Sequence, residues 1–208
     1  MSKRIEKLEK QMQQLMSRMP APSQQPKRRR SRRKRRAPGP GQGVSNGELR
    51  LSKLELVESI KAVKATGAGS GSVKLVVSGL PFLKKIGDSF ERIKWLKCRV
   101  LYKPLVGTIR DGGVTLGVDW NFKDVATTRA NIACYTPTQS GPVFKEFSLT
   151  LPPSRLQSRL WYMASSDDAE GGPAIVAYAV AGCSSTTGDI TVGEIWVEYT
   201  VVLSGTRA

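Results

Sequence analysis

The residues with the plainest chemistry form a basic run near the N-terminus. Nine of the ten residues from 27 to 36 are basic, namely Lys27, Arg28, Arg29, Arg30, Arg32, Arg33, Lys34, Arg35 and Arg36. Such a run neutralises phosphates and releases their condensed counterions, and arginine contacts phosphate in a bidentate manner. No aromatic residue interrupts the run, so base stacking is not available there. We therefore expect sequence-tolerant contacts with a nucleic-acid backbone.

Two other interpretations of the basic run stay open at this point. Short basic runs of the same kind also serve as nuclear-localisation signals, and such a signal can coexist with nucleic-acid binding. The run can also be no more than a solvated stretch of charge.

A second group of chemically capable residues lies in the stretch 112–124, GGVTLGVDWNFKD. Asp119 and Asn121 fall on one side of a predicted strand, and Asp124 follows after a turn. Hard oxygen ligands at this spacing suit Ca²⁺. The alternative is a loop capped by ordinary hydrogen bonds.

Other candidate groups have plainer interpretations. Asp167, Asp168 and Glu170 form an acidic turn, which is either a solvated loop or a contact for basic residues of a neighbouring molecule. The four tryptophans fall in strand candidates, where packing is the default and a sugar-binding platform is the alternative; they are Trp95, Trp120, Trp161 and Trp196.

The composition argues against several classes of protein. Histidine is absent, which removes the most common general base and zinc ligand. No nucleophile–base pair, phosphate-binding loop or zinc cluster is present, so we do not expect an enzyme or a bound cofactor other than possible calcium. The three dispersed cysteines do not form a disulfide framework and are predicted to be buried thiols. No signal peptide or membrane-spanning run is apparent.

Charge is distributed unevenly along the 208 residues. Residues 1–36 hold fourteen basic and two acidic residues, whereas residues 37–208 hold nineteen basic and fifteen acidic residues. This asymmetry predicts a basic arm (1–47) on a nearly balanced globular domain (48–208). Within the arm, 20–47 is rich in Pro, Gln and Gly and is expected to be disordered, with a hinge over 37–47.

The start of the arm, residues 2–19, is predicted to form a short amphipathic helix. Its apolar residues follow the 3-4 spacing of a coiled-coil seam: Ile5, Leu8, Met12, Leu15 and Met19. Prolines at 20 and 22 end it. The stripe is short, so we expect either weak self-association among tethered arms or an amphipathic segment that is disordered alone.

The domain after residue 48 consists of short Val-, Ile- and aromatic-rich runs separated by Gly, Pro and Ser clusters. Eight strands are predicted, over 52–64, 71–78, 91–103, 114–122, 144–151, 159–164, 174–181 and 191–203. A short helix is expected within 80–90 and a helical turn within 124–129. Eight strands with long excursions favour an all-β antiparallel sandwich. The runs within 174–181 and 191–203 carry few charges, so we expect them to be central strands or strands covered by neighbouring subunits.

This order of elements resembles the shell-domain coat proteins of sobemoviruses and tombusvirus-like viruses, which are small icosahedral positive-strand RNA plant viruses. Four stretches carry the resemblance. They are FERIKWLKCRVLYKPLVGT (90–108), GGVTLGVDWNFKD (112–124), FSLTLPPSRLQSRLWYMAS (147–165) and PAIVAYAVAGCSSTTGDITVGEIWVEYTVVL (173–203). The resemblance covers about 53–203 in element order, and its basic arm stands in the expected place.

The resemblance implies an eight-stranded jelly roll that assembles with many copies of itself and packages single-stranded RNA through the arm. It places the chain in a virion and in the host cytoplasm, with no membrane partner. It also implies that Asn121 and Asp124, with Asp119 nearby, bind calcium between subunits. Asn121 stands where the family often has a charge, and the terminal GTRA lacks amide side chains that complete some family sites. No protruding domain follows the jelly roll, so a shell-only subunit is expected.

Two other classes of binding protein are alternatives to a coat protein. The alternative is a cellular nucleic-acid-binding protein of ribosomal or chromatin type, with a basic tail on a β-sandwich. The near-neutral body argues against it, because its basic residues show no concentration along the sequence. An extracellular jelly-roll ligand or lectin fits poorly with the arginine-rich arm.

Overall fold

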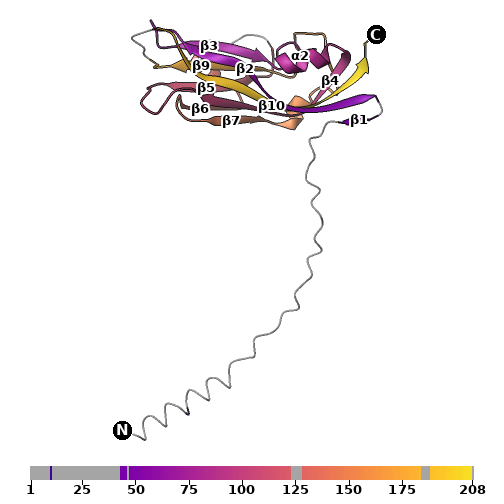
Figure 1. Ribbon diagram of the computed structural model, residues 1–208, viewed down its shortest axis with the longest axis horizontal. Coiled ribbons are helices and arrows are strands. Elements are labelled where there is room, and N and C mark those ends of the chain that lie inside the picture. Colours follow the sequence, from indigo (N-terminus) through magenta and orange to yellow (C-terminus); the bar gives the residue numbers. More distant parts are fainter. Residues whose placement is uncertain (1–9, 11–42, 46, 123–127, 184–187, 208) are drawn as a thin grey trace. The chain divides into compact units, whose positions relative to one another are not determined.

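The computed structural model describes residue 10, residues 43–45, 47–122, 128–183 and 188–207. Two antiparallel sheets lie face to face (Figure 1). The first sheet runs in the order β1-β2-β10-β4-β7, with β8 also paired to β4, and the second runs β3-β9-β5-β6. Most successive strands alternate between the sheets, as in a jelly roll. The predicted all-β sandwich is confirmed.

The strands and helices have the following bounds. The first sheet contains β1 (Gly43–Ser45), β2 (Glu48–Ala62), β10 (Ile190–Thr206), β4 (Phe90–Pro104), β7 (Phe147–Leu151) and β8 (Tyr162–Met163). The second sheet contains β3 (Gly69–Lys74), β9 (Ile175–Ala181), β5 (Gly113–Asp119) and β6 (Thr138–Pro142). The helices are α2 (Pro81–Gly87), α3 (Arg129–Ala133) and α4 (Pro153–Leu156).

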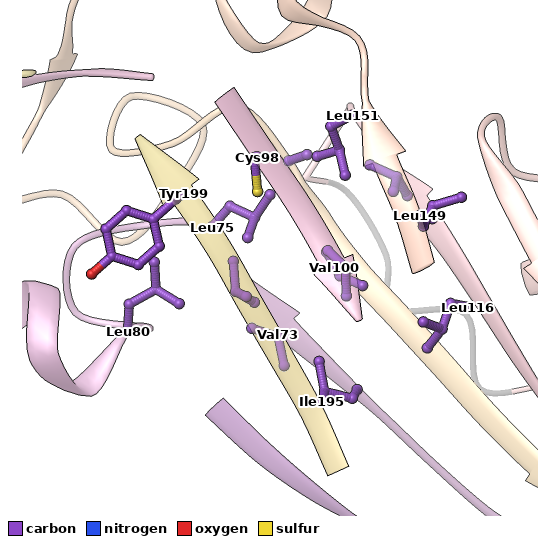
Figure 2. Packing of buried hydrophobic residues seen from close by; sticks show 14 of the residues in the cluster. Val73, Leu75, Leu80, Cys98, Val100, Leu116, Leu149, Leu151, Ile195 and Tyr199 are labelled. Atoms are coloured by element: carbon purple, nitrogen blue, oxygen red, sulfur yellow. The ribbon is translucent and has the colours of Figure 1, made fainter. Parts of the chain in front are cut away.

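The core fills the space between the two sheets. Figure 2 shows Val100 of β4, Leu149 of β7 and Leu116 of β5 among the side chains that meet there. Trp95 and Tyr199, on neighbouring strands of the first sheet, pack edge to face with their ring centroids 6.0 Å apart. As predicted from their apolar runs, β9 and β10 are the central strands, each with a partner strand on both sides.

Several boundaries differ from the sequence-based prediction. Gly43–Ser45, assigned to the hinge, form β1 at the edge of the first sheet, because they pair with residues 48–50 of β2. β6 was not predicted, since its sequence TQSGP has no hydrophobic alternation. It is an edge strand that pairs only with β5 in the described part of the chain. The predicted strand over 159–164 is reduced to the two residues of β8.

Two helical segments were predicted in the domain. The helix expected within 80–90 is α2. Most of the helical turn expected at 124–129 lies outside the described residues, and α3 starts at Arg129. Thr128 caps α3 by accepting a hydrogen bond from the Asn131 amide. α3 packs on the outer face of β5, where a Cβ on Gly117 would lie 2.7 Å from the Ile132 carbonyl oxygen. Glycine is therefore required at this crossing.

A buried carboxylate ties the first sheet to α2. Glu55 of β2 is 7% exposed, and its two oxygens accept hydrogen bonds from the Tyr199 hydroxyl at 2.7 Å and from the Phe82 amide at 2.6 Å. Phe82 lies in the first turn of α2, where backbone amides have no acceptor within the helix. The N-cap residue Leu80 offers no side-chain acceptor, so Glu55, from a strand distant in the sequence, accepts the hydrogen bond that a capping side chain would accept.

Candidate functional site

Two of the predicted calcium ligands, Asp119 and Asn121, lie where β5 ends. Asp119 is the last residue of β5, and its Oδ1 accepts a hydrogen bond from the Asn121 amide at 2.9 Å. Phe122 has a φ of 54°, in the left-handed region, so the chain turns sharply there. The strand predicted over 114–122 therefore ends three residues early, because the aspartate side chain closes a turn on its own backbone.

Two of the three predicted ligands fall in the described part of this turn. Asp119 is 7% exposed, whereas the Asn121 side chain is exposed. They do not share one side of a strand, because Asn121 lies beyond the strand. Asp124 is outside the described residues. Among the residues that the structure does describe, no three acidic, cysteine or histidine side chains cluster as a metal site would require.

The donor chemistry of this turn still suits a hard cation. One carboxylate oxygen of Asp119 is engaged by the Asn121 amide, which leaves its second oxygen and the amide oxygen of Asn121. Ca²⁺ takes six to eight oxygen ligands. The side chains of Asp119 and Asn121 are too few to form such a site on their own. The structure also contains the hydrogen bond that the capped-loop alternative required.

The acidic turn at 167–170 is organised within the subunit. Asp168 accepts hydrogen bonds from the Ser166 hydroxyl at 2.6 Å and from the Glu170 amide at 2.7 Å. These bonds, the Ser166 hydroxyl foremost, hold the pKa of Asp168 below its usual value. Asp167 accepts a hydrogen bond from the Ser78 hydroxyl, and its carbonyl oxygen accepts one from Lys74 Nζ. The arrangement matches the interpretation of this stretch as a solvated loop.

The four tryptophans do not behave alike. Trp95 is fully buried, as packing predicted, but the other three are partly exposed. Trp120 lies just beyond β5, where its indole nitrogen donates to the Thr136 carbonyl at 2.7 Å. Trp161 immediately precedes β8. Trp120 and Trp161 therefore lie outside the strands in which they were predicted. Trp196 is in β10, on the face that points away from the core.

The three cysteines differ in their burial. Cys98 and Cys183 are buried, as predicted, and burial raises the pKa of both thiols. Cys134, expected to be buried, is exposed. It follows α3 directly, and its thiol donates a hydrogen bond to the Ala130 carbonyl at 3.4 Å. Only the position of this short helix on the outer face of the sheet decides its exposure.

One concentration of charge becomes visible only in the folded domain. Five basic side chains lie along the outward face of β4: Arg92, Lys94, Lys97, Arg99 and Lys103. In the sequence these residues alternate with core residues, and acidic residues elsewhere in the domain balance their charge, so the net charge of the domain does not reveal them. The signal available was their near-alternation with apolar residues over 92–103, which marks one face of a strand.

The basic run, the N-terminal stripe of Ile5, Leu8, Met12, Leu15 and Met19, and Asp124 lie outside the described residues. The structure therefore does not place them, and their roles remain predictions. Of the described helices, none has the length and apolar character to cross a membrane.

The topology and the arrangement of the sheets define a jelly-roll domain of the viral-shell type. The model of the viral coat protein S domain family matches residues 18–208. The chain therefore belongs to the viral coat protein S domain family. The resemblance drawn from the sequence is confirmed.

Individual relatives agree with this assignment. The capsid protein of Cucumber necrosis virus is 30% identical over 125 residues, which cover 59% of this chain and 32% of that protein. The matched region thus spans about a third of the relative's length.

Solved structures share the fold. A structure of tobacco necrosis virus superposes with a TM-score of 0.72 at 17% identity, covering 82% of this chain and 88% of that one. Cocksfoot mottle virus gives a TM-score of 0.62 at 15% identity, covering 75% and 94%. Cucumber necrosis virus gives 0.67 at 21% identity, covering 79% and 58%.

Proposed function

We propose that this chain builds an icosahedral viral shell from many copies of itself and packages single-stranded RNA inside it. The observation that carries the proposal is the family match over residues 18–208, supported by the jelly-roll strand order. The domain contributes a sandwich with a large hydrophobic core between its two sheets. The alternative of a ribosomal- or chromatin-type binder has no comparable support.

The test of shell formation is direct. The expressed chain, mixed with RNA at low salt, should elute in size-exclusion chromatography as megadalton particles and appear as closed shells in electron micrographs. The RNA inside should resist added ribonuclease. Elution as monomers or small oligomers under these conditions would contradict the proposal.

The RNA-binding role belongs to the basic run, Lys27–Arg36. Charge repulsion between arms opposes assembly without RNA, and RNA phosphates remove that repulsion. Replacing the nine basic residues by glutamine should abolish packaging and lower the salt dependence of RNA binding by up to about six in log–log slope, since each single-strand phosphate contact contributes about 0.7. Normal packaging by this variant would show that the run is not the main RNA contact.

We further propose that Asp119, Asn121 and Asp124 bind calcium at the contact between two subunits. Removing the ion would leave carboxylates without their counter-charge, and the particle should loosen. Chelation should therefore slow sedimentation of assembled particles, and Asp124→Ala should have the same effect without chelator. Unchanged sedimentation under both treatments would leave the turn as an ordinary hydrogen-bonded loop.

The N-terminal stripe is proposed to associate with the stripes of neighbouring arms inside the particle. Tethering to a shell raises the effective concentration, which compensates for the short length of the seam. Replacing Leu8 and Leu15 by serine should leave the RNA affinity of the free subunit unchanged and reduce cross-linking between arms in particles.

The protein would be found in the virion and in the host cytoplasm. The basic run would also serve nuclear import if it acts as a localisation signal.

A further inference from the structure

We propose that the outward face of β4, together with Trp196 of β10, is a second RNA-binding surface, built into the folded domain rather than the arm. It would bind phosphates through its basic row and stack a base on the indole. The identity of the ligand as RNA rests on the proposed packaging function. The surface itself is a feature of the described structure.

A bulge in β4 keeps the basic row on one face. Ile93, Trp95, Cys98, Val100 and Tyr102 point into the core, so the residues between them point outward. The register with β10 shifts between Thr200 and Val201, which pair with Lys97 and Trp95, so Leu96 is an extra residue in β4. Without that shift the alternation would turn Lys97 toward the core.

The row has the spacing of an extended charged track. Outward residues of a strand recur about every 6.6 Å, and the distance from Arg92 to Lys103 is about 35 Å. The facing strand β10 offers only two carboxylates to this row, from Glu198 opposite Arg99 and Glu194 opposite Lys103. Five basic side chains against two acidic ones leave the face positive.

Three of the five basic groups face no carboxylate on β10. Within the described residues, the ion pair of this domain joins Arg99 Nη1 to Glu198 Oε2 at 3.9 Å, between side chains that are about half exposed. Arg99 also donates to the Ser148 hydroxyl at 2.8 Å. Arg92, Lys94 and Lys97 lie opposite Ser204, Val202 and Thr200, none of which carries a charge. Their charge is therefore available to an external anion.

Aromatic rings stand beside the row. Trp196 is partly exposed, and Lys103 Nζ lies over its ring, 4.0 Å from the centroid, so a base that stacks on that face displaces the ammonium toward its phosphate. Its indole nitrogen donates to Glu194 at 2.9 Å, which fixes the ring orientation. Trp161 lies near the other end, with Lys94 Nζ 6.0 Å from its centroid. Basic side chains interleaved with aromatic rings are the chemistry of single-stranded nucleic-acid binding, and the arm has no aromatic residue at 20–47.

The basic arm and the domain belong to one chain, so a ligand of the arm is tethered to the domain. The arm joins the domain through β1, a strand of the same sheet as β4. RNA held by a tethered arm is present at a high effective concentration near the domain. Weak contacts on β4 can then contribute, even where the isolated face would bind poorly.

The experiment uses the full chain and an oligouridylate, with affinity measured by fluorescence anisotropy over a range of NaCl concentrations. Replacing Arg92, Lys94 and Lys97 by glutamine should lower the log–log salt slope by about two, because three phosphate contacts are lost. The matched control replaces Lys84, Lys85 and Lys145, which are exposed elsewhere on the domain, and should keep the wild-type slope.

The indole contributes a different signature. Trp196→Ala should weaken binding by about fivefold to a hundredfold at fixed salt while leaving the slope unchanged, because stacking releases no counterions. Trp196→Phe should retain part of that affinity. Circular dichroism at matched concentrations confirms that each variant is folded.

Two results would overturn the proposal. The first is a slope for the β4 variant equal to that of the control variant. The second is normal RNA binding accompanied by failed assembly, which would assign the face to contact with a second copy of the chain. The nine-glutamine arm variant separates this question from packaging: if it alone loses its slope, the arm binds RNA and the β4 face does not.

Discussion

Glu55 offers the sharpest test of how the sandwich is held together. Its carboxylate is the acceptor for both the buried Tyr199 hydroxyl and the first-turn Phe82 amide. Glu55→Ala removes both bonds and leaves two donors without a partner, at about 1–3 kcal/mol each. We expect the free energy of unfolding to fall by about 3 kcal/mol. Glu55→Gln, which retains one acceptor oxygen, should cost about 1–2 kcal/mol.

The measurement is equilibrium urea unfolding of the RNA-free subunit, followed by tryptophan fluorescence at a salt concentration that prevents assembly. Glu58→Gln is the matched control, because Glu58 is exposed on the same strand, and should stay within about 0.5 kcal/mol of wild type. The double variant with Tyr199→Phe should be less destabilised than the sum of the singles by at least about 1 kcal/mol. Equal stability of the Glu55→Ala and Glu58→Gln variants would refute the reasoning.

Three further predictions concern the packing of the domain. Gly193→Ala would push a Cβ into the tyrosine ring of β4 and should cost about 1–3 kcal/mol in urea unfolding, whereas Gly107→Ala, with open space around it, should be neutral. In the native subunit a thiol reagent should modify Cys134 first and reach Cys98 only on unfolding, because Cys98 is buried and its pKa is raised; equal rates would contradict the burial. Burial, and secondarily the charge of Glu58, raises the pKa of Tyr178 from 10.0 to about 12, so its contribution to stability is complete below pH 10 and is lost as pH rises toward 12. Thermal unfolding should show Tm falling over that interval, and a flat Tm would contradict it.

Much of the sandwich could be predicted from hydrophobic pattern alone. The run at 174–181 is apolar on both faces and the run at 191–203 is apolar on its inner face, and both are central strands of their sheets. The edge strand β6 could not be found in this way, because it presents only polar and small residues and is held by its backbone pairing with β5. The same limit applies to β1.

The candidate sites were predictable to different degrees. The calcium ligands were read from residue type and spacing, but the turn geometry separates Asn121 from the strand that carries Asp119. A side chain that bonds to its own backbone changes the direction of the chain over two residues, and strand periodicity does not anticipate this.

By itself, the sequence predicted a basic arm ahead of a β-rich body, and it identified the family, because charge and hydrophobicity are recorded residue by residue. Only the tertiary structure decided that Glu55 serves α2, that Cys134 is exposed, and that β4 presents its basic residues on one face. Each of these depends on partners far away in the chain. Strand register, a one-residue bulge and the placement of a short helix fix them; the near-alternation over 92–103 hints at the face of β4, but the bulge that keeps Lys97 on it is set by pairing with β10.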